Sequence, residues 1–335
     1  MGSHRRTAPS SGAERSAALA LGLLSAAATA LGAVPATAAP QEDTRAEVDR
    51  LYREAERATE AYNAADERAG ALRREIADAQ DGIARKQQRV NTMREALGSL
   101  AGSQYRSGGL DPALALLLSD DPEDYLEKAS VLDRIGARQA AQLKRLRGTL
   151  RSLSQDRAEA AKRLGALERS RKAAATHKRT VEGKLAEARR LLGSLPAGER
   201  AAWDRASRSG RTDGPGGAPA SGRAAAALAA ARSALGKPYV WGASGPSAFD
   251  CSGLTQWAYA QAGVALPRTS QAQRYAGRQV PLSEARPGDL VLYRSDASHV
   301  GMYTGNGQVI HAPYPGAPVR YDPVGMMPVS SVTRV

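Results

Sequence analysis

Two long stretches of the chain carry apolar residues at alternating intervals of three and four positions. They occupy residues 48–100 and 129–195. A seven-residue repeat sustained over this length is typical of coiled-coil helices rather than of helices in a globular domain. We therefore predict a long α-helical coiled-coil hairpin over residues 43–205, with its tip near 101–125. The pattern leaves open whether the two helices pair within one chain or between two.

The predicted tip of the hairpin carries a cluster of leucines. The cluster consists of Leu114, Leu116, Leu117 and Leu118, and acidic residues follow it at positions 120–124. An apolar patch ringed by charge often marks an interface, so the cluster is a candidate docking surface for a partner. The alternative is that these leucines cap the end of the coil.

The pattern changes in the last third of the chain. Residues 206–223 are rich in Ser, Gly and Pro and are predicted to form a flexible linker. Residues 224–335 are about one domain in length. They begin with an alanine-rich helix that ends at Gly236. A second helix is predicted to start at Cys251, because Asp250 is a good N-cap and apolar residues recur at helical spacing after it.

Short strand-like runs follow the second helix, at residues 289–293, 299–304, 308–312 and 319–321. Gly305-Asn306-Gly307 joins the second run to the third and is a strong hairpin signal. His299 lies at the start of this hairpin and His311 near its end, and their equal parity places them on one face if the register is even. The predicted class is α+β, with helices packed on a small antiparallel sheet.

Residues 1–38 have the features of a secretory signal peptide. Arg5 and Arg6 precede an apolar stretch at 17–34, and Ala36-Thr37-Ala38 offers a cleavage site. A membrane anchor is the weaker interpretation, because small and polar residues interrupt the apolar stretch. We therefore expect a secreted, cell-wall-associated protein, and we leave open whether the signal peptide is removed.

Export makes the cysteine count informative. Cys251 is the only cysteine of the chain, so it cannot form an internal disulfide and is either a reactive thiol or an intermolecular link. Its predicted place in the first turn of a helix exposes it to backbone N–H groups and to the positive end of the helix dipole. We therefore predict a lowered thiol pKa, as expected of a nucleophile.

The net charge of +13 is concentrated in one part of the chain. Lys and Arg greatly outnumber Asp and Glu between residues 138 and 190. For an exported protein, the expected anionic partners are wall polymers and membrane headgroups. No aromatic residue interleaves the basic run, which disfavours nucleic acid. The alternative is that these charges only form a solvated helix face.

The lone cysteine and two histidines of the C-terminal domain suggest a cysteine protease. Such an enzyme needs an imidazole that takes the thiol proton and later protonates the leaving amine, and a polar group that orients this imidazole. We assign Cys251 as nucleophile, His299 as base and His311 as the orienting residue. Two alternatives remain: ordinary partly buried histidines, and a zinc site, which the absence of closely spaced ligand pairs disfavours.

Six motifs of this domain resemble those of the NlpC-type cell-wall peptidases, which are papain-like cysteine hydrolases of bacterial peptidoglycan. The motifs are residues 235–242, 249–254, 267–270, 286–290, 298–303 and 309–312. The resemblance implies the same three catalytic residues, without a cofactor or a metal. It also implies that the hydroxyl of Tyr239 approaches the catalytic cysteine, and that Asp250 and Ser252 help to hold the free amine of the stem peptide.

The resemblance further implies cleavage between γ-D-glutamate and a diamino acid of the stem peptide, in wall remodelling or daughter-cell separation. The coil resembles the hairpins of secreted wall hydrolases that are activated by a membrane division complex of the FtsEX kind. We hypothesise that the coil covers the Cys251 cleft or tethers it to a partner. Two other functions stay open: an amidase or acyltransferase on the same fold, and a non-catalytic wall-binding scaffold.

Overall fold

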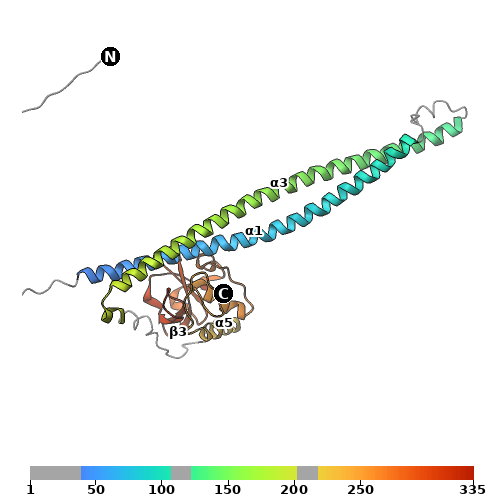
Figure 1. The fold of residues 1–335 in the computed structure, drawn as a ribbon. Helices are drawn as coiled ribbons and strands as arrows, with labels where there is room; N and C mark the ends of the chain where they lie inside the picture. The colour runs from blue at the N-terminus through green and yellow to red at the C-terminus, as the bar shows by residue number, and fades with distance from the viewer. Residues whose placement is uncertain (1–38, 107–121, 202–217) are drawn as a thin grey trace, which may run out of the picture.

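The computed structural model describes residues 39–106, 122–201 and 218–335 (Figure 1). The predicted signal peptide and the leucine cluster at positions 114–118 lie outside the described residues, as does most of the predicted linker. Among the described residues, no helix combines the length and the apolar character that crossing a membrane requires.

Two helices of more than sixty residues each dominate the N-terminal part. α1 spans Ala39–Arg106 and α3 spans Pro122–Ser194. They run side by side in opposite directions (Figure 1). Their contact buries apolar residues from the three-four pattern, including Leu51, Leu72, Ile76, Val90, Leu153, Val181 and Leu185. α3 begins at Pro122, which suits the first helical position because its missing N–H would have no partner there.

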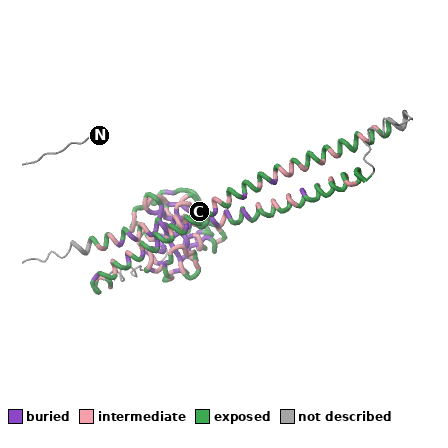
Figure 2. The backbone as a smooth tube through the Cα atoms, turned by 45° about the horizontal axis from the view of Figure 1, so that its top comes forward, coloured by how far each residue is buried: buried purple, intermediate pink, exposed green. Residues whose placement is uncertain are grey.

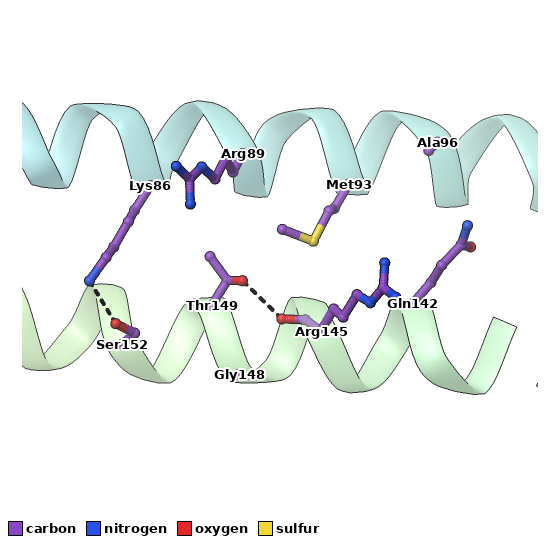
Figure 3. Close-up of a pocket in the computed structure, with 9 residues that line it drawn as sticks. All are labelled: Lys86, Arg89, Met93, Ala96, Gln142, Arg145, Gly148, Thr149 and Ser152. Atoms are coloured by element: carbon purple, nitrogen blue, oxygen red, sulfur yellow. Dashed lines mark hydrogen bonds between the residues drawn. The ribbon is translucent and has the colours of Figure 1, made fainter. Parts of the chain in front are cut away.

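Burial is unequal along the helical pair. The buried positions gather in the half beside the C-terminal residues, and the far half is mostly exposed or intermediate (Figure 2). In that far half, a groove of about 660 Å³ opens between the two helices (Figure 3). Lys86, Arg89 and Arg145 line it. Lys86 Nζ donates to Ser152 Oγ at 2.7 Å and forms an ion pair with Asp156 at 2.5 Å, so the two arginines carry most of the free positive charge. The far half of the pair therefore presents a basic groove.

Residues 218–335 form an α+β unit, as predicted, which we call the C-terminal unit. Its helices are α5 (Gly222–Ser233), α6 (Cys251–Gln261) and α7 (Ser270–Gln273), with short 3₁₀ turns at Leu282–Glu284 and Val324–Met326. Its strands are β1 (Arg278–Val280), β2 (Leu290–Tyr293), β3 (His299–Gly305), β4 (Gln308–His311), β5 (Arg320–Pro323) and β6 (Val329–Arg334). Residues 222 and 223, predicted to belong to the linker, lie in the first turn of α5.

The six strands form one antiparallel sheet in the order β1-β6-β2-β3-β4-β5. The four predicted strands are present with ends shifted by one or two residues, whereas β1 and β6 were not predicted. The main core lies between one face of the sheet and the helices α5 and α6, and contains Leu254, Leu290, Met302 and Ile310. All of its residues belong to the C-terminal unit, so this unit has a core of its own.

Candidate active site

α6 places the only cysteine at the first position of a helix, as predicted. Asp250 is the N-cap, and its Oδ1 accepts the N–H of Gly253 at 2.7 Å. A Cβ at Gly253 would lie 2.2 Å from the carbonyl oxygen of Ala243. Only a glycine therefore allows the start of α6 to sit this close to the preceding loop. Cys251 itself is fully buried.

The β3–β4 hairpin brings the two histidines together. Its register pairs Met302 with Ile310, which puts His311 opposite Gly301 and on the same face as His299. A Cβ at Gly301 would lie 3.3 Å from that of His311, so the glycine leaves room for the second imidazole. His299 Nε2 and His311 Nδ1 are 2.8 Å apart, and the two rings meet edge to face. The predicted pair is thus a direct hydrogen-bonded contact.

The cysteine and the hairpin meet at one point. The Sγ of Cys251 lies within 4.8 Å of a ring nitrogen of His299. Because His299 Nε2 is bonded to His311, Nδ1 is the nitrogen left to serve the thiol. The structure therefore brings Cys251, His299 and His311 into one line of contacts, and the assignment of nucleophile, base and orienting residue stays a prediction.

A carboxylate that was not predicted continues this line of contacts. Asp322, on β5, accepts a hydrogen bond from His311 Nε2 at 2.8 Å. The Nε of Arg320 donates to the same carboxylate oxygen at 2.8 Å. Burial tends to raise the pKa of Asp322, but His311 and Arg320 outweigh burial and keep this pKa below its ordinary value. Burial also lowers the pKa of His311 to about 4.

The two polar residues flanking the cysteine form a network with Arg268. Its Nη2 lies 2.6 Å from Asp250 Oδ2, and its Nη1 donates to Ser252 Oγ at 3.0 Å. Asp250 Oδ2 also accepts the N–H of Gly242 at 2.9 Å. Asp250 therefore holds the loop, the helix start and Arg268 together, in addition to any contact with substrate.

Tyr239 lies in the loop before α6 and is largely buried. Burial and then the negative charge of an ionised Cys251 raise the pKa of its phenol. The approach of its hydroxyl to the catalytic cysteine, which the resemblance implies, stays a prediction.

Three polar side chains of α1 reach into this site from outside the C-terminal unit. We call Glu56, Glu60 and Asn63 the α1 triad, and all three are buried. Glu56 contacts His299 Nδ1 through one carboxylate oxygen and Arg294 through the other. The side-chain N–H of Asn63 donates to Asp250 Oδ2 at 3.1 Å. The nitrogen that should serve the thiol is therefore occupied by a carboxylate.

Glu60 is the member of the triad that lies against the nucleophile. Its Oε1 is 3.7 Å from Cys251 Sγ and accepts the hydroxyl of Ser252 at 2.7 Å. Its Oε2 accepts the backbone N–H of Ser270 at 2.7 Å. Burial and the neighbouring Asp250 raise the pKa of Glu60 to about 7. Aromatic contacts flank the triad, with Tyr52 stacked on Tyr314 and Tyr62 edge-on to Trp241.

The predicted lowering of the cysteine pKa is wrong for this arrangement. Burial, followed by the charges of Glu60, Glu56 and Asp250, raises the pKa of Cys251 well above its ordinary value. A helix start does favour a thiolate. However, α1 excludes water from the sulfur and places two carboxylates beside it, and these two effects on the thiol pKa are larger than that of the helix start. In this arrangement Cys251 is a protonated thiol.

The hydrogen-bond partners of the ring nitrogens of His299 and His311 indicate which of these nitrogens carry a proton. Burial tends to raise the pKa of Glu56, but His299 and Arg294 outweigh it and leave the pKa below its ordinary value, so Glu56 is ionised. A carboxylate only accepts, so His299 Nδ1 carries a proton toward Glu56 and His311 Nε2 carries one toward Asp322. The remaining contact, between His299 and His311, then needs a proton on His299 Nε2. His299 Nδ1 therefore offers no lone pair to the thiol proton while it faces Glu56.

One group of side chains could be considered as a metal site. One oxygen of Glu56, the Sγ of Cys251 and a ring nitrogen of His299 lie within 4.8 Å of one another. Arg294 donates to the same carboxylate of Glu56, which counts against an additional cation. The zinc site that the sequence left open, with both histidines as ligands, does not fit, because His299 Nε2 and His311 Nδ1 bond each other.

Comparison with known proteins gives the C-terminal unit a family. The family model "NlpC/P60 family" matches residues 236–332. A protein of Corynebacterium glutamicum named "Probable endopeptidase" is 50% identical over 117 residues, which cover 35% of this chain and 56% of that protein. A protein of Mycobacterium tuberculosis H37Rv, also named as an endopeptidase, is 29% identical over 337 residues, which cover 86% of this chain and 88% of its own length. This chain therefore spans little more than half the length of the first of these relatives.

Among solved structures, the NlpC/p60 domain of the peptidoglycan hydrolase SagA is 37% identical. The match covers 33% of this chain and 98% of that one, with a TM-score of 0.32.

Proposed function

From the NlpC/P60 domain at residues 236–332, we propose that this chain is a secreted peptidoglycan hydrolase. It is a cysteine endopeptidase that cleaves stem peptides between γ-D-glutamate and a diamino acid, outside the cytoplasm and at the cell wall. The observation that carries the proposal is the contact line from Cys251 through His299 to His311. Relatives named as endopeptidases support the reaction class.

The reaction follows from this line of residues. Nδ1 of a neutral His299 takes the thiol proton, and the thiolate attacks the peptide carbonyl carbon to form a tetrahedral adduct. The imidazolium returns the proton to the leaving amine as the C–N bond breaks, which leaves a thioester on Cys251. A water molecule, deprotonated by His299, then hydrolyses the thioester and regenerates the thiol. His311 holds the ring of His299 throughout.

Mass spectrometry of digested muropeptides tests the bond. Incubation of the enzyme with purified disaccharide-tetrapeptides should release a peptide that begins with the diamino acid and leave a glycan fragment that ends in glutamate. Release of the whole stem from the sugar would instead identify an amidase. New peptide bonds to an added amine would identify an acyltransferase.

We further propose that α1 holds the enzyme inactive. This proposal is supported by the protonation of both reacting groups while the α1 triad is seated. His299 already carries a proton on Nδ1 toward Glu56, so it cannot accept another, and Cys251 is a thiol beside Glu60. Substrate is also excluded, since Cys251 is fully buried. Activation therefore requires α1 to leave the site.

The isolated C-terminal unit tests this inhibition. A fragment of residues 218–335 keeps Ser221, whose side chain accepts the N–H of Ala224 and caps α5, and it keeps the whole main core. We expect it to hydrolyse muropeptides faster than the full chain. Equal rates for the two proteins would remove the case for inhibition by α1.

Glu60 makes the inhibited arrangement sensitive to pH. Its pKa is raised to about 7 in the closed site, from 4.5 for an ordinary glutamate. Because this pKa is higher in the closed site, protonation of Glu60 stabilises the closed arrangement. The stabilisation is complete below about pH 4.5 and is lost as the pH rises through about 7. Asp250 contributes to this rise and hydrogen bonds from Ser252 and Ser270 oppose it, and Cys251 and Arg268 also interact with Glu60.

Alkylation of the single cysteine measures this opening. Between about pH 5 and pH 8, we expect the iodoacetamide rate of the full chain to rise more steeply than that of the 218–335 fragment, which has no α1. Glu60→Gln mimics the protonated carboxyl and should flatten the excess rise. Parallel pH profiles for the full chain and the fragment would contradict the expected role of Glu60.

We propose that the far half of the helical pair binds partners. The basic groove lined by Lys86, Arg89 and Arg145 supports contact with anionic wall polymers. Exposed apolar side chains near the distal end, Tyr105 at 86% and Leu126 at 69% exposure, support docking of a membrane division complex of the FtsEX kind. Co-sedimentation with purified walls tests the contact with anionic polymers. The wild type and the double variant Arg89→Glu, Arg145→Glu are each compared on walls with and without these polymers. Equal sedimentation in all four combinations would refute the contact.

A further inference from the structure

We propose that Asp322 is a positioning residue of the reaction, acting through His311 to hold His299 in the tautomer that can accept the thiol proton. This inference rests on the proposed hydrolase function. It adds a fourth member to the line formed by Cys251, His299 and His311, and it assigns Arg320 to the support of that fourth member.

Strand register places the fourth member on the correct face. β4 pairs with β5 so that His311 lies opposite Arg320 and Val309 lies opposite Asp322. Arg320 and Asp322 are two residues apart and therefore share the face of His311. The same diagonal relation connects His311 with His299 across β3 and β4. Three neighbouring strands thus place the two imidazoles and the carboxylate in one row, joined by side-chain hydrogen bonds.

The row fixes the proton on each ring nitrogen. Asp322 Oδ2, 2.8 Å from His311 Nε2, can only accept, so His311 carries its proton on Nε2. A neutral His311 then presents a bare Nδ1, which accepts the Nε2–H of His299 over 2.8 Å. Once α1 has left, a neutral His299 with its proton on Nε2 has a bare Nδ1. This is the lone pair that takes the proton of Cys251.

Without the Asp322 carboxylate, no contact in the row determines which histidine donates in the hydrogen bond between His299 and His311. His311 could carry its proton on Nδ1 and donate it to His299 Nε2, which would place the proton of His299 on Nδ1, facing the sulfur. His299 would then be unable to act as the base. The state is excluded in the structure because it would set a bare His311 Nε2 against an ionised carboxylate. The low pKa of His311, about 4, keeps its imidazole neutral, so only one of its two nitrogens carries a proton.

The surroundings of Asp322 keep it ionised. Arg320 Nε donates to the oxygen that His311 also contacts, and burial, followed by the charge of this carboxylate, raises the pKa of Tyr293 on β2. The carboxylate is largely but not fully buried, with 17% of its side chain exposed. A negative charge beyond His311 also stabilises the imidazolium that forms on His299 when the thiol ionises.

Asp322→Asn tests the proposal in the full chain and in the Glu56→Gln background, where the contact between α1 and the site is weakened. An amide can turn its N–H₂ toward His311 and no longer dictates the tautomer. We expect kcat to fall by about tenfold to a hundredfold with little change in KM. We also expect the acid limb of the kcat/KM profile, which reports the deprotonation of His299, to move to lower pH, since the imidazolium of His299 loses a stabilising charge.

Asp289→Asn is the matched control. Asp289 is a buried carboxylate directly before β2, and its Oδ2 accepts from Nη2 of Arg334 on β6 at 2.7 Å. Its side-chain hydrogen bonds go to Arg286 and Arg334, and neither histidine is among its partners. The variant should lower the melting temperature and leave the pH profile of the folded enzyme unchanged. Asp322→Glu, which keeps the carboxylate, should recover part of the lost kcat.

A measurement without substrate separates this proposal from the proposed function. In ¹⁵N-histidine spectra of the full chain, which contains four histidines, His311 should show a proton fixed on Nε2, and Asp322→Asn should convert this signal to a tautomer mixture. An unchanged His311 tautomer, or an unchanged kcat and pH profile, would overturn the positioning role. An inactive enzyme that shows the expected tautomer change would overturn only the proposed hydrolase function.

Discussion

Replacement of Cys251 by alanine is expected to abolish the hydrolysis of stem peptides. The sulfur is the only group at the start of α6 that can form the acyl intermediate, and the chain has no second cysteine to substitute for it. Loss of a covalent nucleophile typically removes a thousandfold or more of the rate, so we expect activity to fall by at least about a thousandfold. The measurement is the turnover of purified muropeptides by the 218–335 fragment, where α1 cannot interfere.

Folding must be unchanged for this result to bear on chemistry. Cys251 is fully buried and packs in the main core, so the smaller alanine leaves a small cavity and lowers the stability somewhat, and the melting temperature checks that the variant stays folded at the assay temperature. Retained activity in Cys251→Ala would refute the nucleophile assignment. A wild-type protein that hydrolyses nothing, but whose Cys251→Ala variant still complements a deletion strain, would favour the wall-binding scaffold.

Glu56→Gln is expected to activate the full chain. The glutamate forms ion pairs with both His299 and Arg294 in a buried setting. Removal of one partner from a buried pair costs about 3–5 kcal/mol, because the remaining charges lose their compensation. The loss falls on the closed arrangement alone, and about 1.4 kcal/mol already shifts an equilibrium tenfold. We therefore expect the rate of the full chain to rise at least about tenfold toward that of the 218–335 fragment.

Glu67→Gln provides the matched control on the same helix. Glu67 is exposed on α1 and lies outside the triad, so the same change of charge there should leave the rate unaltered. The variant Glu56→Gln in the 218–335 fragment cannot exist, so the fragment serves as the upper limit of activation. An unchanged rate in Glu56→Gln, with an unchanged melting temperature, would show that this ion pair does not restrain the enzyme.

The long helices and the proximity of Cys251, His299 and His311 could be predicted from the sequence because each has a local signal. The helices follow from apolar spacing, and α6 follows from Asp250 as N-cap before a helical pattern. The His299–His311 pairing follows from a Gly-Asn-Gly turn between two residues of equal parity. β1 has only three residues and β6 alternates weakly, so neither gave a readable period. Their pairing depends on tertiary contacts.

The residues that the sequence analysis missed depend on contacts between distant segments. Asp322 is defined as a partner of His311 only by the β4–β5 register, and Arg268 only by the fold of the loop after α6. The α1 triad did leave a trace, since Glu56, Glu60 and Asn63 recur at intervals of four and three residues on one helical face. A polar stripe on a coil is ordinarily solvated. Recognition of this stripe as an active-site contact required the position of the C-terminal unit against α1.

The buried position of the Cys251 sulfur affects how readily it is oxidised before the enzyme is active. Oxidants attack the thiolate, and only where they can reach it. While α1 is seated, Cys251 is both protonated and inaccessible, and a chain in an oxidising environment is stored with its nucleophile chemically intact. If α1 leaves the site as proposed, the exposure of Cys251 that permits turnover also permits its oxidation to a sulfenic acid. Each molecule would therefore have a limited working lifetime after it opens.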